Sequence, residues 1–255
     1  GGTDMGLVVF VGAGPGQADL ITLRGARELV AADVVLADAL ADPALRDLAP
    51  HARWIDVGKR GFGQTTPQQA IDALLVRLAH RHQRVVRLKG GDPSVLGRLE
   101  EELQALGAAG IRCEIVPGVT ATLAAAADTQ RPLTRRGVGR SVSLGTAMTR
   151  EGRLQAAQHA DTEVYYMAGR QLGALGRRLR LGGWPADTPV CVVSRAGWPD
   201  SLSSDHALAE LAQAALLHAG RPTVVTVGAG ARGVPTAPIT TLADNALTEA
   251  PSLAA

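Results

Sequence analysis

The fold follows from residues 7–16, LVVFVGAGPG, where an apolar run ends in a glycine-rich turn. The run from Leu7 to Gly12 is rich in β-branched residues, a pattern typical of a strand that is buried on both faces. A helical stretch, Thr22–Ala32, follows the turn, and ADVVLAD supplies a second apolar run. A strand, a helix and a strand in this order predict parallel strands joined by a right-handed crossover.

Strand and helix signals continue along the chain, but their pattern changes after Pro117-Gly118, where an Ala-rich stretch, Val119–Ala127, begins. Before this point, strands are predicted in RWIDVG, RVVRLKGGDP and RCEIVPG, and helices over Pro67–Arg81 and Gly97–Ala109. After it come four strand candidates, RSVSLGT, TEVYYM, TPVCVVS and RPTVVTVG, with helices near Gln171–Leu181 and Ala207–Ala219. We therefore predict an α/β protein of two α/β domains. The N-terminal domain, residues 6–117, has a parallel sheet, residues 118–245 form the C-terminal domain, and residues 246–255 form a frayed tail.

The composition is that of a globular protein. Of the 255 residues, 46% are hydrophobic and 20% are charged, and the formal net charge is +2, which excludes disordered and fibrous proteins. The chain has no long basic run and no apolar segment of ~18 residues, so neither a nucleic-acid nor a membrane partner is expected. The first residues lack the basic region of a signal peptide, and we expect a cytoplasmic protein.

Cysteine and lysine are both rare. Cys113 and Cys191 lie in apolar runs without the spacing of a zinc or redox motif, so we predict buried strand thiols and no metal site. The lysines are Lys59 and Lys89, in a chain with 26 lysine and arginine residues, and both are next to glycine turns. This placement predicts that both lysines are held by a geometry that a planar guanidinium cannot supply.

The first glycine turn has part of the pattern of a dinucleotide-binding loop, but its register does not fit. That pattern requires a third glycine where the chain has Gln17, and Pro15 lacks the N–H group that a pyrophosphate would need. A tight turn at the carboxyl end of a strand still lines a ligand pocket in an open sheet. We favour a ligand-lining turn over a purely structural turn and over a pyrophosphate site.

Three other strand ends carry candidate ligand contacts. The glycines of Gly90-Gly91-Asp92-Pro93 would allow a ligand close to the backbone, and Asp92 could accept hydrogen bonds from a ribose or an ammonium, although a solvent turn is about as common there. Thr120 follows a Pro-Gly turn, where a lone threonine more often caps a helix. The Tyr165-Tyr166-Met167 strand end taken alone is more often core.

Together these segments resemble the uroporphyrinogen-III C-methyltransferases of the tetrapyrrole methylase superfamily. The resemblance spans roughly residues 7–230, with the shared segments in the same order. VGAGPG and GGDP are shared with neighbouring corrin-ring methylases, whereas VGKRG, TPQQAI and VVRLKGGDP point to the uroporphyrinogen family more narrowly. The remaining shared segments are GIRCEIVPGVTA, RPLTRR and YYMAG.

The resemblance implies an S-adenosylmethionine-dependent enzyme that methylates uroporphyrinogen III at carbons 2 and 7. The products would be S-adenosylhomocysteine and precorrin-2, which feeds sirohaem, cobalamin or haem d1 synthesis. The resemblance also implies a homodimer with the active site in the cleft between the two domains of each chain. The family binds its cofactor folded in that cleft, which explains why the register of a dinucleotide loop does not fit.

The same motifs imply the site residues. On the cofactor side these are the residues at the strand-end turns: Pro15, Gly90, Gly91, Asp92, Val95, Thr120, Ala121, Met167 and Ala196. On the substrate side Asp38 and Lys59 match acid/base candidates, and Arg98, Glu101 and Arg136 match positions facing a substrate that carries eight carboxylates. Guanidinium groups pair with carboxylates in bidentate geometry.

The departures from the family pattern lie on the substrate side. Ala39 replaces the arginine of the family's Asp-Arg-Leu, and Leu99 and Glu100 replace two glycines. Two alternatives therefore stay open, namely methylation of another tetrapyrrole such as a precorrin-type intermediate, and a non-catalytic tetrapyrrole-binding paralogue. The register of the first turn disfavours a NAD-dependent oxidoreductase.

Overall fold

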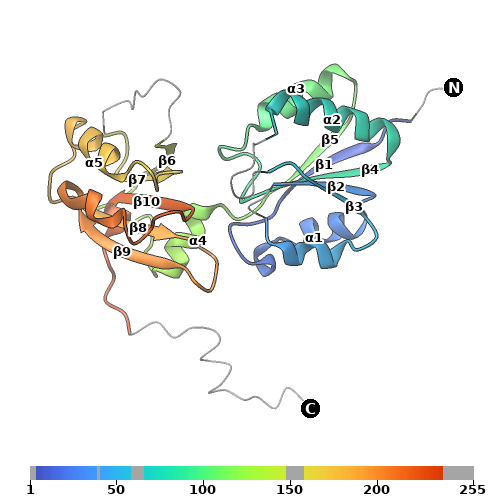
Figure 1. Ribbon diagram of the computed structural model, residues 1–255. Coiled ribbons are helices and arrows are strands. Elements are labelled where there is room, and N and C mark those ends of the chain that lie inside the picture. Colours follow the sequence, from blue (N-terminus) through green and yellow to red (C-terminus); the bar gives the residue numbers. More distant parts are fainter. Residues whose placement is uncertain (1–3, 39–40, 59–65, 148–157, 238–255) are drawn as a thin grey trace, which may run out of the picture.

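The computed structural model describes residues 4–38, 41–58, 66–147 and 158–237, and two sheets of five strands lie within them (Figure 1). The chain passes from the first sheet to the second between Val116 and Ala121. The two sheets therefore lie on either side of residue 118, where we place the domain boundary. Ala39, Lys59 and the predicted tail, residues 246–255, lie outside the described residues.

The first sheet is parallel throughout, as its sequence predicts. Its order is β3-β2-β4-β1-β5, so that β1 and β4 lie at its centre. The strands are β1 (Leu7–Gly12), β2 (Val34–Ala37), β3 (Arg53–Asp56), β4 (Arg84–Lys89) and β5 (Cys113–Val116). The edge position of β5 leaves Cys113 only half-buried, so the prediction of a buried thiol is wrong there, while Cys191 is buried in the second sheet.

Helices cover both faces of the first sheet (Figure 1). Alternate residues of β1 face opposite sides, with Val9 and Val11 in one core and Val8 and Phe10 in the other. On the first side lie α1 (Leu23–Val30) and the 3₁₀ helices η1 (Ala18–Leu20) and η2 (Pro43–Leu48); on the second lie α2 (Gln68–Arg81) and α3 (Leu99–Ala108). Burial on both faces explains why β1 has no polar alternation.

The second sheet has the order β6-β7-β10-β8-β9 and is mixed. The β6–β7 pair is parallel, and the other three pairs are antiparallel. The strands are β6 (Val142–Thr146), β7 (Thr162–Tyr166), β8 (Pro189–Ser194), β9 (Leu202–Ala207) and β10 (Thr223–Gly228). The helices are α4 (Ala121–Asp128) and α5 (Leu172–Leu181), and the 3₁₀ helices η3 (Leu208–Ala214) and η4 (Ala229–Ala231).

Two expectations for this half are wrong. Strand β9, LSSDHA, was not predicted, because it is a largely exposed edge strand without an apolar face. The helix expected over Ala207–Ala219 is the shorter 3₁₀ helix η3. In the part of the chain that the structure describes, no helix has the length and apolar character needed to cross a membrane.

Candidate functional site

Three turns meet at the carboxyl ends of β1, β4 and β5. Gly14 and Gly91 exchange backbone hydrogen bonds of 3.2 and 2.8 Å. A Cβ atom on Gly12 would lie 2.7 Å from the Gly118 Cα atom, and one on Gly118 would lie 2.3 Å from the Gly91 carbonyl oxygen. Backbones this close leave no room for a side chain, so packing requires glycine at positions 12 and 118.

A cavity of about 590 Å³ opens beside these turns, and residues of both halves of the chain line it. Its N-terminal side consists of Gly14, Pro15, Ala41, Pro43, Gly90, Gly91, Asp92 and Leu96. Its other walls consist of Thr120, Ala121, Tyr166, Met167, Val193, Arg195, Ala196, Trp198, Pro222, Thr223 and Val224. The structure thus brings together every residue predicted to bind a cofactor except Val95, which is half-buried outside the cavity, where Leu96 takes the wall position.

The cavity wall contains strained backbone. Leu96, Met167 and Arg195 have φ values of 52°, 55° and 51°, and a non-glycine residue in this region costs on the order of 1–3 kcal/mol. Met167 is 49% exposed and lines the cavity, so the core position that its strand end alone favours is not what the structure has, and its assignment to the cofactor side stays a prediction. Such strain is concentrated at functional sites.

Thr120 does not cap the helix that it precedes. Thr120 is the N-cap residue of α4, but its side chain makes no capping hydrogen bond. The Oγ1 atom lies 2.6 Å from the Tyr166 hydroxyl oxygen, which accepts a hydrogen bond of 2.5 Å from Thr122 Oγ1. The Thr122 N–H also donates to this oxygen, at 3.4 Å, so both of its acceptor positions are occupied and its own hydrogen is directed to Thr120. The Thr120 hydrogen, which has no other partner among the described residues, can be donated into the cavity.

Asp92 connects two of the turns. Its Oδ1 atom accepts a hydrogen bond of 2.7 Å from the Ser94 N–H, and its Oδ2 atom accepts one of 2.9 Å from the Gly118 N–H. A carboxylate oxygen has two acceptor positions, so each oxygen can accept a further hydrogen bond from a ligand. Asp92 can thus hold the turns and line the cavity at once.

A direct contact joins the two halves next to Pro15. The Gln17 N–H donates to the Gly197 carbonyl at 3.1 Å, and the Gly197 N–H donates to Asp128 Oδ2 at 2.9 Å. A Cβ atom on Gly16 would lie 2.4 Å from the Gly197 carbonyl carbon and oxygen. This contact fixes the two sides of the cavity relative to each other.

The cavity wall around Arg195 was not predicted. The Arg195 Nε atom donates to Asp200 at 2.8 Å, and its guanidinium lies 4.8 Å from the centroid of the Trp198 ring. The signal that the sequence offered was the position of Arg195, directly after the predicted strand TPVCVVS. Two charged residues, Asp92 and Arg195, line the cavity.

A buried polar network lies behind Arg195. His218 is fully buried between Ser194 and Ser204, with N–O distances of 2.7 and 2.8 Å. The Arg221 Nε atom donates to Ser194 at 2.8 Å. Burial, and then the charges of His206 and Arg221, lower the pKa of His218, so its ring is held neutral. Ser194 is the last residue of β8, so this network fixes the start of the Arg195 wall.

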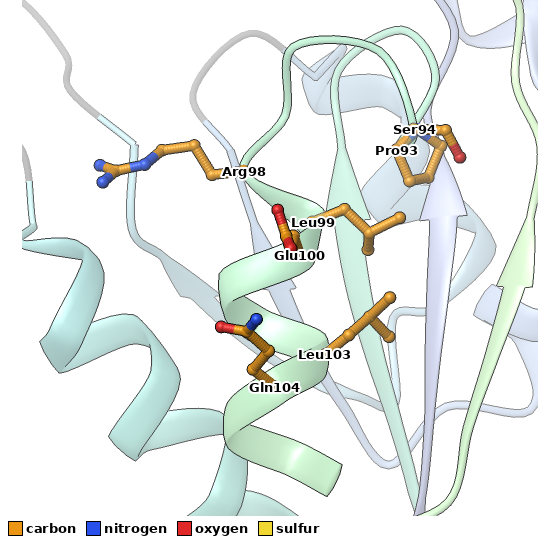
Figure 2. A pocket seen from close by; sticks show the side chains of 7 residues that line it. All are labelled: Pro93, Ser94, Arg98, Leu99, Glu100, Leu103 and Gln104. Carbon is orange, nitrogen blue, oxygen red and sulfur yellow. The ribbon is translucent and has the colours of Figure 1, made fainter.

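Among the predicted substrate-side residues that the structure describes, none lines the cavity. Asp38 Oδ1 accepts a hydrogen bond of 2.9 Å from Arg87. Arg98 and Glu101 form an ion pair at the N-terminal end of α3, where their side chains are 54% and 46% exposed. Pro93, Ser94 and Arg98 line a separate surface groove at this end of α3. Figure 2 shows Arg98 extending from the helix end, away from Pro93 and Ser94. Arg136 is exposed in the segment between α4 and β6, and Lys59 lies outside the described residues.

Comparison with known proteins assigns the fold to a family. Residues 7–212 match the family model of the tetrapyrrole (corrin/porphyrin) methylases. The chain belongs to this family. The resemblance seen in the sequence is thereby confirmed, and so is the two-domain α/β fold class.

Relatives of this tetrapyrrole methylase include curated enzymes and solved structures. It is 40% identical to a uroporphyrinogen-III C-methyltransferase of Pseudomonas aeruginosa, over 92% of this chain and 98% of that one. It is also 40% identical to a siroheme synthase of Neisseria meningitidis, over 88% of this chain but 48% of that longer protein. The structure of the Thermus thermophilus uroporphyrin-III C-methyltransferase complexed with S-adenyl homocysteine superposes with a TM-score of 0.75, at 35% identity, covering 88% of this chain and 97% of that one.

Proposed function

We propose that this methylase transfers methyl groups from S-adenosylmethionine to carbons 2 and 7 of uroporphyrinogen III and so makes precorrin-2. The observation that carries the proposal is one cavity lined by the strand-end turns of both halves. The chain is also 40% identical to a uroporphyrinogen-III C-methyltransferase over nearly its whole length. The homodimer and the cytoplasmic location belong to the same proposal.

The cavity residues fit S-adenosylmethionine. A volume of about 590 Å³ is within the usual range for sites that hold a small molecule or cofactor. Pro15, Met167 and Ala196 offer an apolar surface for the adenosyl group, and thioethers pack well against aromatic rings. Thr120 has a hydroxyl hydrogen to donate, and Asp92 has unused acceptor positions for ribose hydroxyls or an ammonium group. When bound, the cofactor supplies a methyl group that is electrophilic because it is attached to a sulfonium.

The glycines at the turns allow the ligand to approach the backbone. Gly90 and Gly91 line the cavity, and Gly91 has a φ of 65°, which a residue with a side chain adopts only with strain. The exchange of hydrogen bonds between Gly91 and Gly14 keeps both turns in place. The chain thus holds the ligand by shape and by a few polar groups, and part of the catalysis is proximity.

The substrate side supplies charge and a proton acceptor. The exposed guanidinium groups of Arg98 and Arg136 are suited to carboxylates of the macrocycle. A proton must leave the macrocycle after the new carbon–carbon bond forms. Asp38 is half-buried and uses Oδ1 to accept from Arg87, so Oδ2 is available to take that proton. Lys59 is the second acid/base candidate.

The proposal is tested by incubating the purified protein anaerobically with uroporphyrinogen III and methyl-labelled S-adenosylmethionine. We expect two labelled methyl groups per macrocycle and the mass of precorrin-2. A protein that binds S-adenosylhomocysteine but leaves uroporphyrinogen III unlabelled would have another acceptor, and precorrin-type tetrapyrroles would then be tried. A protein that binds NAD more tightly than S-adenosylhomocysteine would contradict the methyltransferase assignment itself.

A further inference from the structure

Three charged side chains are buried between the first sheet and α3. Arg87 and Lys89, two residues apart on β4, are each 2% exposed, and Glu102 on α3 is fully buried. None of the three lines the cavity between the two halves of the chain. Arg87 and Lys89 lie at the carboxyl end of β4, directly before the Gly90-Gly91 turn.

The contacts of Arg87 and Lys89 reach in two directions from Glu102. The Arg87 Nε atom donates to Glu102 Oε1 at 2.6 Å, and its Nη1 atom donates to Asp38 Oδ1 at 2.9 Å. Lys89 forms an ion pair with Glu102 Oε2, and its Nζ atom donates to the Gly97 carbonyl oxygen. One carboxylate on α3 is thereby connected both to the end of β2 and to the turn before Arg98.

This cluster is not explained by stability alone. Together with Asp38, the cluster has two cations and two carboxylates, so it carries no net charge. Moving such groups out of water costs several kcal/mol per ion, and well-packed apolar side chains of similar volume often give an equal or more stable core. The contacts instead end on Asp38 and on the carbonyl of Gly97, and both Asp38 and the Arg98–Glu101 pair that follows Gly97 are assigned to the substrate side.

We propose that Arg87, Lys89 and Glu102 are positioning residues that hold Asp38 and the Arg98–Glu101 pair in a fixed relation for the tetrapyrrole. This inference rests on the proposed function, because that function assigns Asp38, Arg98 and Glu101 to the substrate side. Arg87 orients Asp38 through Oδ1 and leaves Oδ2 without a hydrogen bond to the described residues. Lys89 holds the carbonyl of Gly97, and so fixes the left-handed backbone of Arg98, whose φ is 55°.

The sharpest variant is Arg87→Met. It leaves Lys89 and Glu102 as a balanced pair and removes the donor to Asp38. We expect kcat with uroporphyrinogen III to fall roughly tenfold or more, because a small misplacement of a reacting group has effects of that size. The affinity for S-adenosylhomocysteine should stay within about twofold. The matched control is Arg84→Met on the same strand, where an exposed arginine pairs with Glu28, and it should keep the parent kinetics.

A double-mutant cycle separates positioning from a merely structural role. If Arg87 acts through Asp38, adding Arg87→Met to Asp38→Asn lowers kcat no further than Asp38→Asn alone. Multiplicative losses, or an unchanged kcat in Arg87→Met, would overturn the proposal. Arg87→Lys should recover part of kcat, because an ammonium can still donate to Asp38 although it lacks the guanidinium fork.

A second measurement does not depend on turnover. Lys89→Met removes the donor to the Gly97 carbonyl, and we expect amide hydrogen exchange in residues 95–101 to become at least several-fold faster. The exchange of β8 in the second sheet should not change. Unchanged exchange in residues 95–101 would overturn the positioning role. A wild-type protein that fails to methylate uroporphyrinogen III would instead overturn the proposed function, whatever the exchange shows.

Discussion

Both sheets place a buried polar network at the carboxyl end of a strand, and the two networks are built from different groups. In the first sheet, Arg87 and Lys89 on β4 pair with the buried carboxylate of Glu102. In the second sheet, the imidazole of His218 lies between the hydroxyls of Ser194 and Ser204. The first network holds groups by ion pairs, and the second holds the cavity wall by hydrogen bonds around a neutral imidazole, with Arg221 donating to Ser194.

The difference determines what each network responds to. Burial alone would lower the pKa of the Arg87 guanidinium, but Asp38 and Glu102 outweigh it and raise the pKa, so this cation stays charged. Burial and the neighbouring charges lower the pKa of His218, so protonation of this ring reduces the free energy of unfolding. The charged network is therefore sensitive to the loss of one partner, and the neutral network is sensitive to acid.

The largest effect is expected from Glu102→Gln. It removes the carboxylate that Arg87 and Lys89 share and leaves two buried cations with only the half-exposed Asp38. The free energy of unfolding, measured in urea, should fall by about 3–5 kcal/mol. The control is Glu100→Gln in the same turn of α3, which is exposed and should change stability by at most about 0.5 kcal/mol. Equal losses in both variants would contradict the charged network.

The neutral network should be broken by acid. Because the pKa of His218 is lower in the folded protein than its ordinary value of 6.5, the unfolded chain binds more protons between these values. The contribution of the neutral His218 ring to the free energy of unfolding should then be fully present above pH 6.5. It should decrease as the pH is lowered below 6.5.

The variant His218→Gln removes the titrating ring. It should cost about 1–3 kcal/mol at pH 8 through lost hydrogen bonds and should flatten the fall in stability below pH 6.5. The exposed His80→Gln on α2 is the control and should keep the parent profile. A profile that is equally steep in His218→Gln would show that the proton is taken up elsewhere.

A smaller effect is expected where the second sheet meets the cavity. Tyr166→Phe removes the hydroxyl that connects Thr120 and Thr122, and we expect the affinity for S-adenosylhomocysteine to fall by up to about tenfold, the value of one hydrogen bond. The neighbouring Tyr165 donates to Glu163 at 3.2 Å and does not line the cavity. Tyr165→Phe should therefore bind the ligand as the parent does, and a loss there of the same size would refute the hydroxyl's role.

The smallest effect on stability is expected from Arg98→Met. Arg98 pairs with Glu101 at the surface, and exposed ion pairs contribute at most about 1 kcal/mol. The free energy of unfolding should hardly change, while kcat/KM for the tetrapyrrole should fall by an amount equivalent to about 1.5–3 kcal/mol. Wild-type kinetics in this variant would make Arg98 an ordinary surface charge.

The sequence predicts the elements whose patterns are local. The run LVVFVG has only one interpretation, and the turns that follow β1, β4 and β5 could be recognised because glycine and proline mark them. The edge strand β9 could not be recognised, because most of its side chains are polar and neither of its faces is apolar. The hydrogen bond between Thr120 and Tyr166 could not be predicted, because the two residues are 46 positions apart in the sequence.

The buried networks could be anticipated only in part. The rarity of lysine pointed to a special geometry at Lys89, and the structure shows that residue buried against Glu102. Arg87 stands between the apolar residues Val86 and Leu88 inside the strand, and this was a signal that could have been used. Nothing in the sequence pairs either residue with Glu102. Three consecutive glutamates follow Leu99 in the first turn of α3, and only the fold decides which of them is buried.

The central claim is that the cavity between the two halves holds the cofactor, and a calorimetric titration with S-adenosylhomocysteine tests it most directly. Ala121, at the start of α4, lines the cavity, whereas Ala127 on the same helix is exposed. The account predicts that Ala121→Leu abolishes binding by filling the cavity, and that Ala127→Leu binds as the wild type does, with both variants folded. Wild-type affinity in Ala121→Leu would contradict the account.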